Sequence, residues 1–330
     1  MVATNVFPAI YSTLSPEALI DGVLSEYKLG SIDRCLFWNR GLSDIYLIET
    51  SEKTYILKIS HHHWRSKTDI QFELEFLDFL AWQDIPVANP LKTKTGELFV
   101  TVNAVEGDRY AALFNYAPGE VPQGDLSLEQ SKIMGRALSR IHAAALEFNS
   151  EISRQPLDLE YLLDDSFKTI SPYLLRQDRD LVDLEREIFK IKQQLACLEQ
   201  TSPLWSVCWG DPHSGNVHFT EDNRITMFDF DQCGYGWRVF DLAKFLQVSL
   251  NTGIKRAIRD SFLAGYQEIQ KLTDAELLSL QALTQMAHIW AWAISINATA
   301  IHNWSRLDDF YTKKRLHQLK RLSTKDWQLF

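Results

Sequence analysis

The sequence predicts an α+β protein in which an antiparallel sheet is followed by a mainly helical region. Residues 54–59 alternate apolar and polar side chains, as a half-buried strand does. Further along the chain, Ser127-Leu128-Glu129-Gln130 is a capping box, which marks the start of a helix. Ala117-Pro118-Gly119 ends the strand-rich part between them. We therefore expect two domains, residues 1–115 and residues 116–330.

The first domain is expected to hold a hairpin, further strands and one helix. Residues 34–38 and 45–49 flank a short polar stretch with a glycine, which predicts a hairpin. In residues 69–82, apolar side chains recur at helical spacing and predict an amphipathic helix. Residues 98–102 and 110–116 read as two more strands.

The second domain reads as helices interrupted by one irregular stretch. Helices are expected from the capping box to about residue 148 and over residues 181–198. Residues 207–230 combine short apolar runs with glycine, proline and aspartate, which indicates short strands and loops. From about residue 239 onward the pattern is helical.

Composition excludes several classes of protein. The 330 residues are 45% hydrophobic and 23% charged, which is typical of a globular chain and not of a disordered one. The 34 Lys and Arg against 43 Asp and Glu give a net charge of −9, which disfavours binding to nucleic acid or anionic membranes. The most apolar stretch, residues 286–301, is short and interrupted by polar residues, so no membrane span is expected. With no CxxC pair and no secretory signal, we expect a cytoplasmic protein.

The residues that point to chemistry lie between Cys208 and Asp231. Phosphoryl transfer needs a carboxylate for the acceptor hydroxyl and oxygen ligands that hold Mg²⁺ against the phosphates of ATP. Asp211 and Asn216 are five positions apart on one loop and provide a candidate base and an amide ligand. Asp229 ends an apolar strand and provides a candidate metal carboxylate. Structural alternatives are a turn capped by Asp211 and an arginine partner for Asp229.

These residues resemble the signature of the aminoglycoside phosphotransferase and choline kinase superfamily, His-Gly-Asp-x4-Asn followed by a strand that ends in Asp-x-Asp. The present chain reads Trp209-Gly210-Asp211 with Asn216, and then Asp229-Phe230-Asp231. The resemblance implies a two-lobed, protein-kinase-like fold and an enzyme that uses ATP and Mg²⁺. The resemblance extends over nearly the whole chain. Within the superfamily, the chain looks most like the bacterial stress-response kinases, with the type II homoserine kinases next.

The resemblance also implies nucleotide-binding residues in the first domain. Lys58 corresponds to the strand lysine that pairs with the phosphates of ATP, and Glu73 to the glutamate that orients this lysine. Asn115 and Tyr116 lie where the family's hinge meets adenine. Ser43 follows the single glycine of the phosphate loop. Glu75 competes with Glu73, but helix geometry lets only one of the two face Lys58.

The sequence does not determine which molecule accepts the phosphate. A protein serine or threonine, as in the stress-response kinases, and a small metabolite such as homoserine or an amino alcohol are both compatible with the sequence, and the oligomeric state is not determined. Aromatic and acidic residues near the C-terminus suggest a site for a cationic acceptor, with helix packing and an exposed acidic turn as the favoured alternative. These residues are Trp290, Trp292, Trp304, Asp308 and Asp309.

Two further positions concern histidine, one where it is present and one where it is replaced. His142 lies on a helix face and is expected to be a hydrogen-bonded core residue. Trp209 replaces the motif histidine that usually braces the catalytic loop, so we expect altered loop packing more than lost chemistry. This substitution also favours one alternative function, a nucleotide-binding scaffold that does not transfer phosphate.

Overall fold

The computed structural model describes residues 8–174, 178–302 and 307–329. Two compact units are present. The first consists of the described residues up to Ala81 together with Ala88–Tyr116 and Ser150–Ser153. The second consists of Trp82–Val87, Ala117–Asn149 and the described residues from Arg154 onward.

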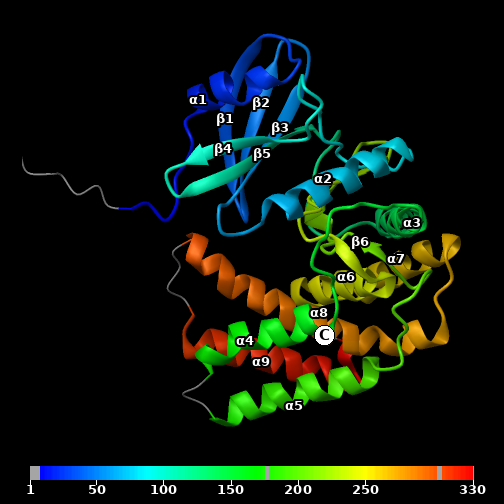
Figure 1. Ribbon diagram of the computed structural model, residues 1–330. Coiled ribbons are helices and arrows are strands. Elements are labelled where there is room, and N and C mark those ends of the chain that lie inside the picture. The colour runs from blue at the N-terminus through cyan, green and yellow to red at the C-terminus, as the bar shows by residue number, and fades with distance from the viewer. Residues whose placement is uncertain (1–7, 175–177, 303–306, 330) are drawn as a thin grey trace, which may run out of the picture. The chain divides into compact units, whose positions relative to one another are not determined.

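The first unit is built on one antiparallel sheet of five strands in the order β1-β2-β3-β5-β4 (Figure 1). The strands are β1 (Ile32–Arg40), β2 (Ser43–Thr50), β3 (Thr54–Ser60), β4 (Val100–Ala104) and β5 (Gly107–Asn115). The predicted hairpin is confirmed, and its turn is shorter than expected because both strands extend into it. Only Gly41 and Leu42 separate β1 from β2.

Two helices accompany the sheet. Helix α1 (Pro16–Gly22) begins at Ser15, whose hydroxyl accepts a hydrogen bond from the backbone N–H of Ala18. Apolar side chains from α1 and from η1 (Leu24–Glu26) form one core with residues of β1, β2, β3 and β5. The predicted amphipathic helix is present as α2 (Lys67–Trp82).

The second unit carries four short helical turns, four short strands and seven helices among the residues that the structure describes. The strands pair as β6 (Trp205–Cys208) with β9 (Gly234–Trp237) and as β7 (Val217–Phe219) with β8 (Ile225–Met227). The helices are α3 (Leu128–Ala145), α4 (Ser166–Ile170), α5 (Asp178–Leu195), α6 (Arg238–Thr252), α7 (Arg256–Ile269), α8 (Asp274–His302) and α9 (Asp309–Leu322).

Close helix pairs hold this unit together. Helix α3 packs against α7, where a Cβ atom on Gly135 would lie 2.0 Å from the carbonyl oxygen of Phe262 and one on Gly265 2.1 Å from that of Lys132. Only glycine permits this approach. Helix α6 packs on α8, and α8 also contacts α4, α5 and α9. The predicted capping box is confirmed at the start of α3, where Ser127 and Gln130 each bond the other's backbone N–H.

The described helices include none that is both long and apolar enough to cross a bilayer. This holds for α8, which contains the apolar stretch noted in the sequence.

His288 of α8 is expected to make stability depend on pH. Burial, together with the charges of Arg315 and Lys244, lowers the pKa of His288 to about 3, although its Nε2 lies 2.9 Å from the carbonyl oxygen of Arg315. An unfolded histidine titrates near pH 6.5, so below that pH the unfolded chain binds a proton that the folded chain excludes. At pH 5 this disfavours folding by about 2 kcal/mol.

The test is urea unfolding at pH 7 and pH 5. The free energy of unfolding of the wild type should fall between pH 7 and pH 5. In His288→Gln this fall should be smaller by about 2 kcal/mol. The control is His317→Gln on the exposed face of α9, which should behave like the wild type. Equal losses in wild type and His288→Gln would show that His288 is not the titrating group.

Candidate active site

Lys58 and Glu73 form an ion pair in the first unit. The Lys58 Nζ atom on β3 lies 3.0 Å from the Oε1 atom of Glu73 on α2, and the two side chains are 13% and 3% exposed. Glu75 is turned elsewhere, because its carboxylate accepts hydrogen bonds from the side chains of Gln71 and Ser150. The spacing of the two glutamates on α2 therefore brings Glu73, and not Glu75, to Lys58.

The other predicted nucleotide-binding residues lie at the ends of strands. Ser43 is buried at the start of β2, and its carbonyl oxygen accepts a hydrogen bond of 3.0 Å from the N–H of Gly41. Asn115 ends β5 and is held by Asn89, through side-chain and backbone hydrogen bonds of 2.7 and 3.2 Å. The N–H of Tyr116 reaches the carbonyl oxygen of Thr54 at 3.4 Å.

Beneath the Gly41 turn lies a buried charge pair that the sequence did not reveal. Arg109 and Asp44 are both fully buried, and Arg109 Nη2 lies 2.9 Å from Asp44 Oδ2. Arg40 approaches the other oxygen of the same carboxylate at 3.2 Å. Burying Asp44 without these cations would be costly, so the pair ties the start of β2 to β5.

Asp211 lies among polar side chains in the second unit. Its carboxylate is 3.3 Å from Lys244 Nζ and 3.6 Å from His213 Nε2, and it accepts a hydrogen bond of 3.2 Å from Gln232. Although burial acts to raise the pKa of Asp211, the Lys244 ammonium and His213 hold that pKa below its usual range. Asp211 is therefore a carboxylate at neutral pH, with Lys244 beside one oxygen and Gln232 and His213 beside the other.

Lys244 is a candidate site residue that the sequence did not reveal. It is 5% exposed at its side chain, and its ammonium lies over the ring of Trp290 at 5.4 Å from the centroid. A lysine within the apolar run Asp241-Leu242-Ala243-Lys244-Phe245 was the available signal, because lysine is rarely buried without a partner.

Asn216 and Asp229 lie on adjacent segments. The side-chain N–H₂ of Asn216 donates a hydrogen bond of 3.1 Å to the backbone carbonyl oxygen of Asp211. The backbone carbonyl oxygen of Asn216 accepts one of 3.0 Å from the N–H of Phe228. Phe228 directly precedes Asp229, so this backbone hydrogen bond brings Asn216 next to the segment that carries Asp229. In the described part of the chain the amide oxygen of Asn216 accepts no hydrogen bond.

A carboxylate and an amide oxygen are ligands that Mg²⁺ prefers, so this donor set fits a divalent cation. Asp229 has an exposed side chain and a backbone φ of 59°, in the left-handed region. For a residue other than glycine this conformation costs about 1–3 kcal/mol and persists only where the surroundings impose it.

Asp241, at the start of α6, holds the loop that carries Asp211. Its carboxylate accepts hydrogen bonds from the backbone N–H groups of Trp209 and Gly210 at 2.7 and 2.8 Å, and it lies 2.9 Å from His142 Nε2. The other ring nitrogen of His142 lies 2.8 Å from the hydroxyl of Tyr266. The prediction of a hydrogen-bonded core histidine is confirmed.

Cys208 completes a buried cluster with His142 and Asp241 whose ligand atoms lie within 4.8 Å of one another. The cluster does not indicate a metal centre, because each group already has a protein partner. Cys208 Sγ donates toward the carbonyl oxygen of Trp237 at 3.3 Å. The cluster instead supports the loop that carries Asp211, because Asp241 binds the backbone N–H groups of Trp209 and Gly210.

Among the described residues, the aromatic and acidic side chains suggested for a cationic acceptor are explained by packing and capping. Trp290 and Trp292 are buried in α8, and Trp290 lies against Lys244 and Tyr161. Asp308 is exposed and caps α9 by accepting a hydrogen bond of 2.8 Å from the N–H of Tyr311. Helix packing and an exposed acidic turn, the favoured alternative, account for these residues. Trp304 lies outside the described residues.

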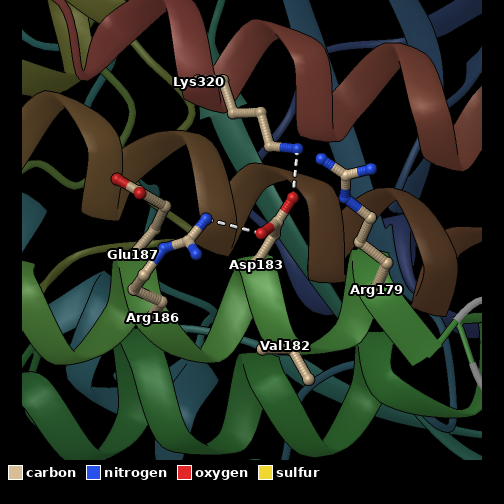
Figure 2. Close-up of a pocket in the computed structure, with 6 residues that line it drawn as sticks. All are labelled: Arg179, Val182, Asp183, Arg186, Glu187 and Lys320. Carbon is tan, nitrogen blue, oxygen red and sulfur yellow. Dashed lines mark hydrogen bonds and ion pairs between the residues drawn. The ribbon is translucent and has the colours of Figure 1, made fainter.

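A surface hollow on α5 and α9 involves none of the predicted site residues. Figure 2 shows Asp183 between Lys320 and Arg186, which both form ion pairs with its carboxylate. Arg179, Val182 and Glu187 complete the lining. This is a network of partly exposed ion pairs, of a kind that contributes little to stability.

The sequence is similar to a known family and to several known proteins. The sequence model of the phosphotransferase enzyme family matches residues 37–281. An uncharacterized protein of Synechocystis is 52% identical over 100% of this chain and 91% of its own length. A homoserine kinase of Paraburkholderia phytofirmans is 25% identical over 94% of this chain and 91% of its own.

Two solved structures share the fold. An amicoumacin kinase in complex with AMP-PNP, Ca²⁺ and Ami superposes with a TM-score of 0.77 at 20% identity, covering 94% of both chains. A microcompartment-associated aminopropanol kinase gives a TM-score of 0.73 at 20% identity, covering 92% of this chain and 97% of its own. The predicted kinase-like fold, an antiparallel sheet followed by a helical region, is confirmed.

Proposed function

The chain belongs to the phosphotransferase enzyme family, and we propose that it transfers the γ-phosphate of ATP to a hydroxyl group of a small acceptor molecule. The observation that carries the proposal is the ionised Asp211, paired with Lys244 and bonded through its backbone to Asn216. A small acceptor is favoured over a protein because the related kinases are named for homoserine, aminopropanol and amicoumacin.

Asp211 is assigned to the acceptor hydroxyl. The hydroxyl oxygen attacks the γ-phosphorus, an O–P bond forms, and the bond to the β-phosphate oxygen breaks to release ADP. The low pKa of Asp211 makes it a weak base, so it first orients the hydroxyl by accepting its hydrogen bond. It receives the proton late, when bonding to phosphorus has made the hydroxyl a strong acid.

Asn216 and Asp229 are assigned to Mg²⁺. The cation, when bound with ATP, neutralises the charge on the phosphates. Support comes from the oxygen donor set and from the amicoumacin kinase, which was solved with a nucleotide and Ca²⁺. In the first unit, Lys58 is assigned to the phosphates and Glu73 to the orientation of Lys58. We assign Ser43, Asn115 and Tyr116 to the same nucleotide.

The proposal is tested by assaying the purified protein with ATP and Mg²⁺ against defined acceptors. We expect ADP release and a phosphorylated product with homoserine, 1-aminopropan-2-ol or another small alcohol in a wider panel. Product identity is checked by mass spectrometry. Nucleotide-dependent thermal stabilisation without turnover on any small or protein acceptor would instead support a scaffold that binds nucleotide.

Glu73→Gln should lower kcat/KM for ATP by about 10- to 100-fold, because Lys58 loses the charge that fixes its position. The matched control is Glu75→Gln on the same helix, which removes a carboxylate that does not contact Lys58. Steady-state kinetics at varied ATP measure both. If the two variants have the same kcat/KM, Glu73 does not orient Lys58 for catalysis.

A further inference from the structure

Trp209 is bonded to the segment that carries the proposed metal ligand. Trp209 occupies the position at which the motif of the aminoglycoside phosphotransferase superfamily has a histidine. Its side chain is fully buried. The indole N–H donates a hydrogen bond of 3.1 Å to the carbonyl oxygen of Asp229. The indole also stacks on the ring of Phe230, with centroids 5.0 Å apart and planes inclined by 16°.

These two contacts hold both sides of one peptide group. The Asp229 carbonyl belongs to the peptide group that joins Asp229 to Phe230, so the hydrogen bond to this carbonyl and the stacking on Phe230 together restrict the orientation of that peptide plane. Asp229 has φ 59°, in the left-handed region, which aspartate enters more often than most residues but still uncommonly. The contacts of Trp209 are one constraint on the segment that adopts this conformation.

Trp209 is itself anchored. Its backbone N–H, with that of Gly210, binds the carboxylate of Asp241 at the start of α6. Gly210, at φ 86°, also brings the Asp211 loop so close to the following segment that a Cβ there would lie 2.1 Å from the carbonyl oxygen of Gln232. The indole therefore extends from a fixed backbone toward Asp229.

We propose that Trp209 is a positioning residue of the metal site, and that its indole N–H sets the direction of the Asp229 carboxylate by fixing the Asp229 backbone. The inference rests on the proposed function, since it takes Asp229 as a ligand of the divalent cation. It also gives the tryptophan a role in place of the histidine, so the departure from the motif does not by itself indicate an inactive protein.

The test compares two tryptophans that make the same hydrogen bond in different places. Trp237 is also buried, and its indole N–H donates to the carbonyl oxygen of Glu199, likewise at 3.1 Å. Trp209→Phe and Trp237→Phe each keep an aromatic ring and remove one indole N–H. Mn²⁺ binding to the full chain in the presence of AMP-PNP is measured by electron paramagnetic resonance, which requires no turnover.

Trp209→Phe should weaken Mn²⁺ binding by about tenfold or more, as outer partners of metal ligands do, whereas Trp237→Phe should stay within about twofold of wild type. Equal Mn²⁺ binding by Trp209→Phe and the wild type, or equal weakening in both variants, would overturn the inference. If the wild type itself binds no Mn²⁺ with the nucleotide, the proposed metal site fails instead, which is a distinguishable result.

A second variant covers the case in which Trp209→Phe does not fold, as judged by circular dichroism. Trp209→His keeps a ring N–H on a smaller ring. Mn²⁺ binding within about threefold of wild type would support the role of the N–H, and a loss of about tenfold or more in a folded Trp209→His protein would overturn it.

Discussion

Asp211→Asn is expected to lower kcat by about 10²–10⁴-fold, the range that general base catalysis contributes. The amide is nearly the same size as the carboxylate but neither receives the proton of the acceptor nor orients its hydroxyl as strongly. Affinity for ATP should change by less than about threefold, because Asp211 is not assigned to the nucleotide. Single-turnover kinetics and nucleotide titration measure the two quantities separately.

Asp222→Asn is a suitable control, because Asp222 is exposed on the turn between β7 and β8 and pairs only with neighbouring residues. It should retain the kcat of the wild type. A folded Asp211→Asn protein with wild-type kcat would remove Asp211 from its assigned role. Loss of folding in this variant is a separate outcome, since Lys244 would then lack its carboxylate partner.

Asp229→Asn is expected to weaken the metal-dependent binding of ATP by at least about tenfold. Two unit charges 4 Å apart attract by about 1 kcal/mol in water and about 4 kcal/mol at an effective dielectric constant of 20. Asp229 is exposed, so its attraction to each charge of the cation is near the lower value, about 1 kcal/mol. A divalent cation carries two such charges, so the attraction is about 2 kcal/mol. The loss therefore exceeds about 1.4 kcal/mol, which corresponds to tenfold.

Calorimetric titration of AMP-PNP with and without Mg²⁺ checks this prediction. Without Mg²⁺ the wild type and Asp229→Asn should bind the nucleotide equally, and only the gain on adding Mg²⁺ should be smaller in the variant. An equal gain in both proteins would mean that Asp229 does not hold the cation.

Local patterns explain why much of the fold was predictable. The alternation in residues 54–59, the capping box at Ser127 and the spacing of apolar residues in α2 each depend on near neighbours. The sequence did not reveal β9, because its Gly-Tyr-Gly-Trp run lacks a strand pattern and is stabilised by pairing with β6, about thirty residues earlier. No element was predicted between residues 149 and 180, where the structure has the π-helical turn η2 (Glu160–Asp165) followed by the short helix α4.

In the candidate site, too, residues close together in the sequence were easier to predict than residues that meet only through tertiary packing. Asp211, Asn216 and Asp229 were proposed because they are close together in the sequence, and Lys58 and Glu73 because of the resemblance to the family. Lys244 was missed because it reaches Asp211 from another helix, so its role depends on tertiary packing. Trp209 was recognised as a departure from the motif, but its hydrogen bond to Asp229 was visible only in the structure.

The central claim is that this chain transfers phosphate from ATP to a hydroxyl group through Asp211. The most direct test incubates γ-labelled ATP and Mg²⁺ with an extract of the source cells and either the wild type or Asp211→Asn, then separates macromolecules from small molecules. We expect label in a small-molecule fraction with the wild type and essentially none with the variant. Label on protein would contradict the small-acceptor proposal, and equal labelling by both proteins would contradict the role of Asp211.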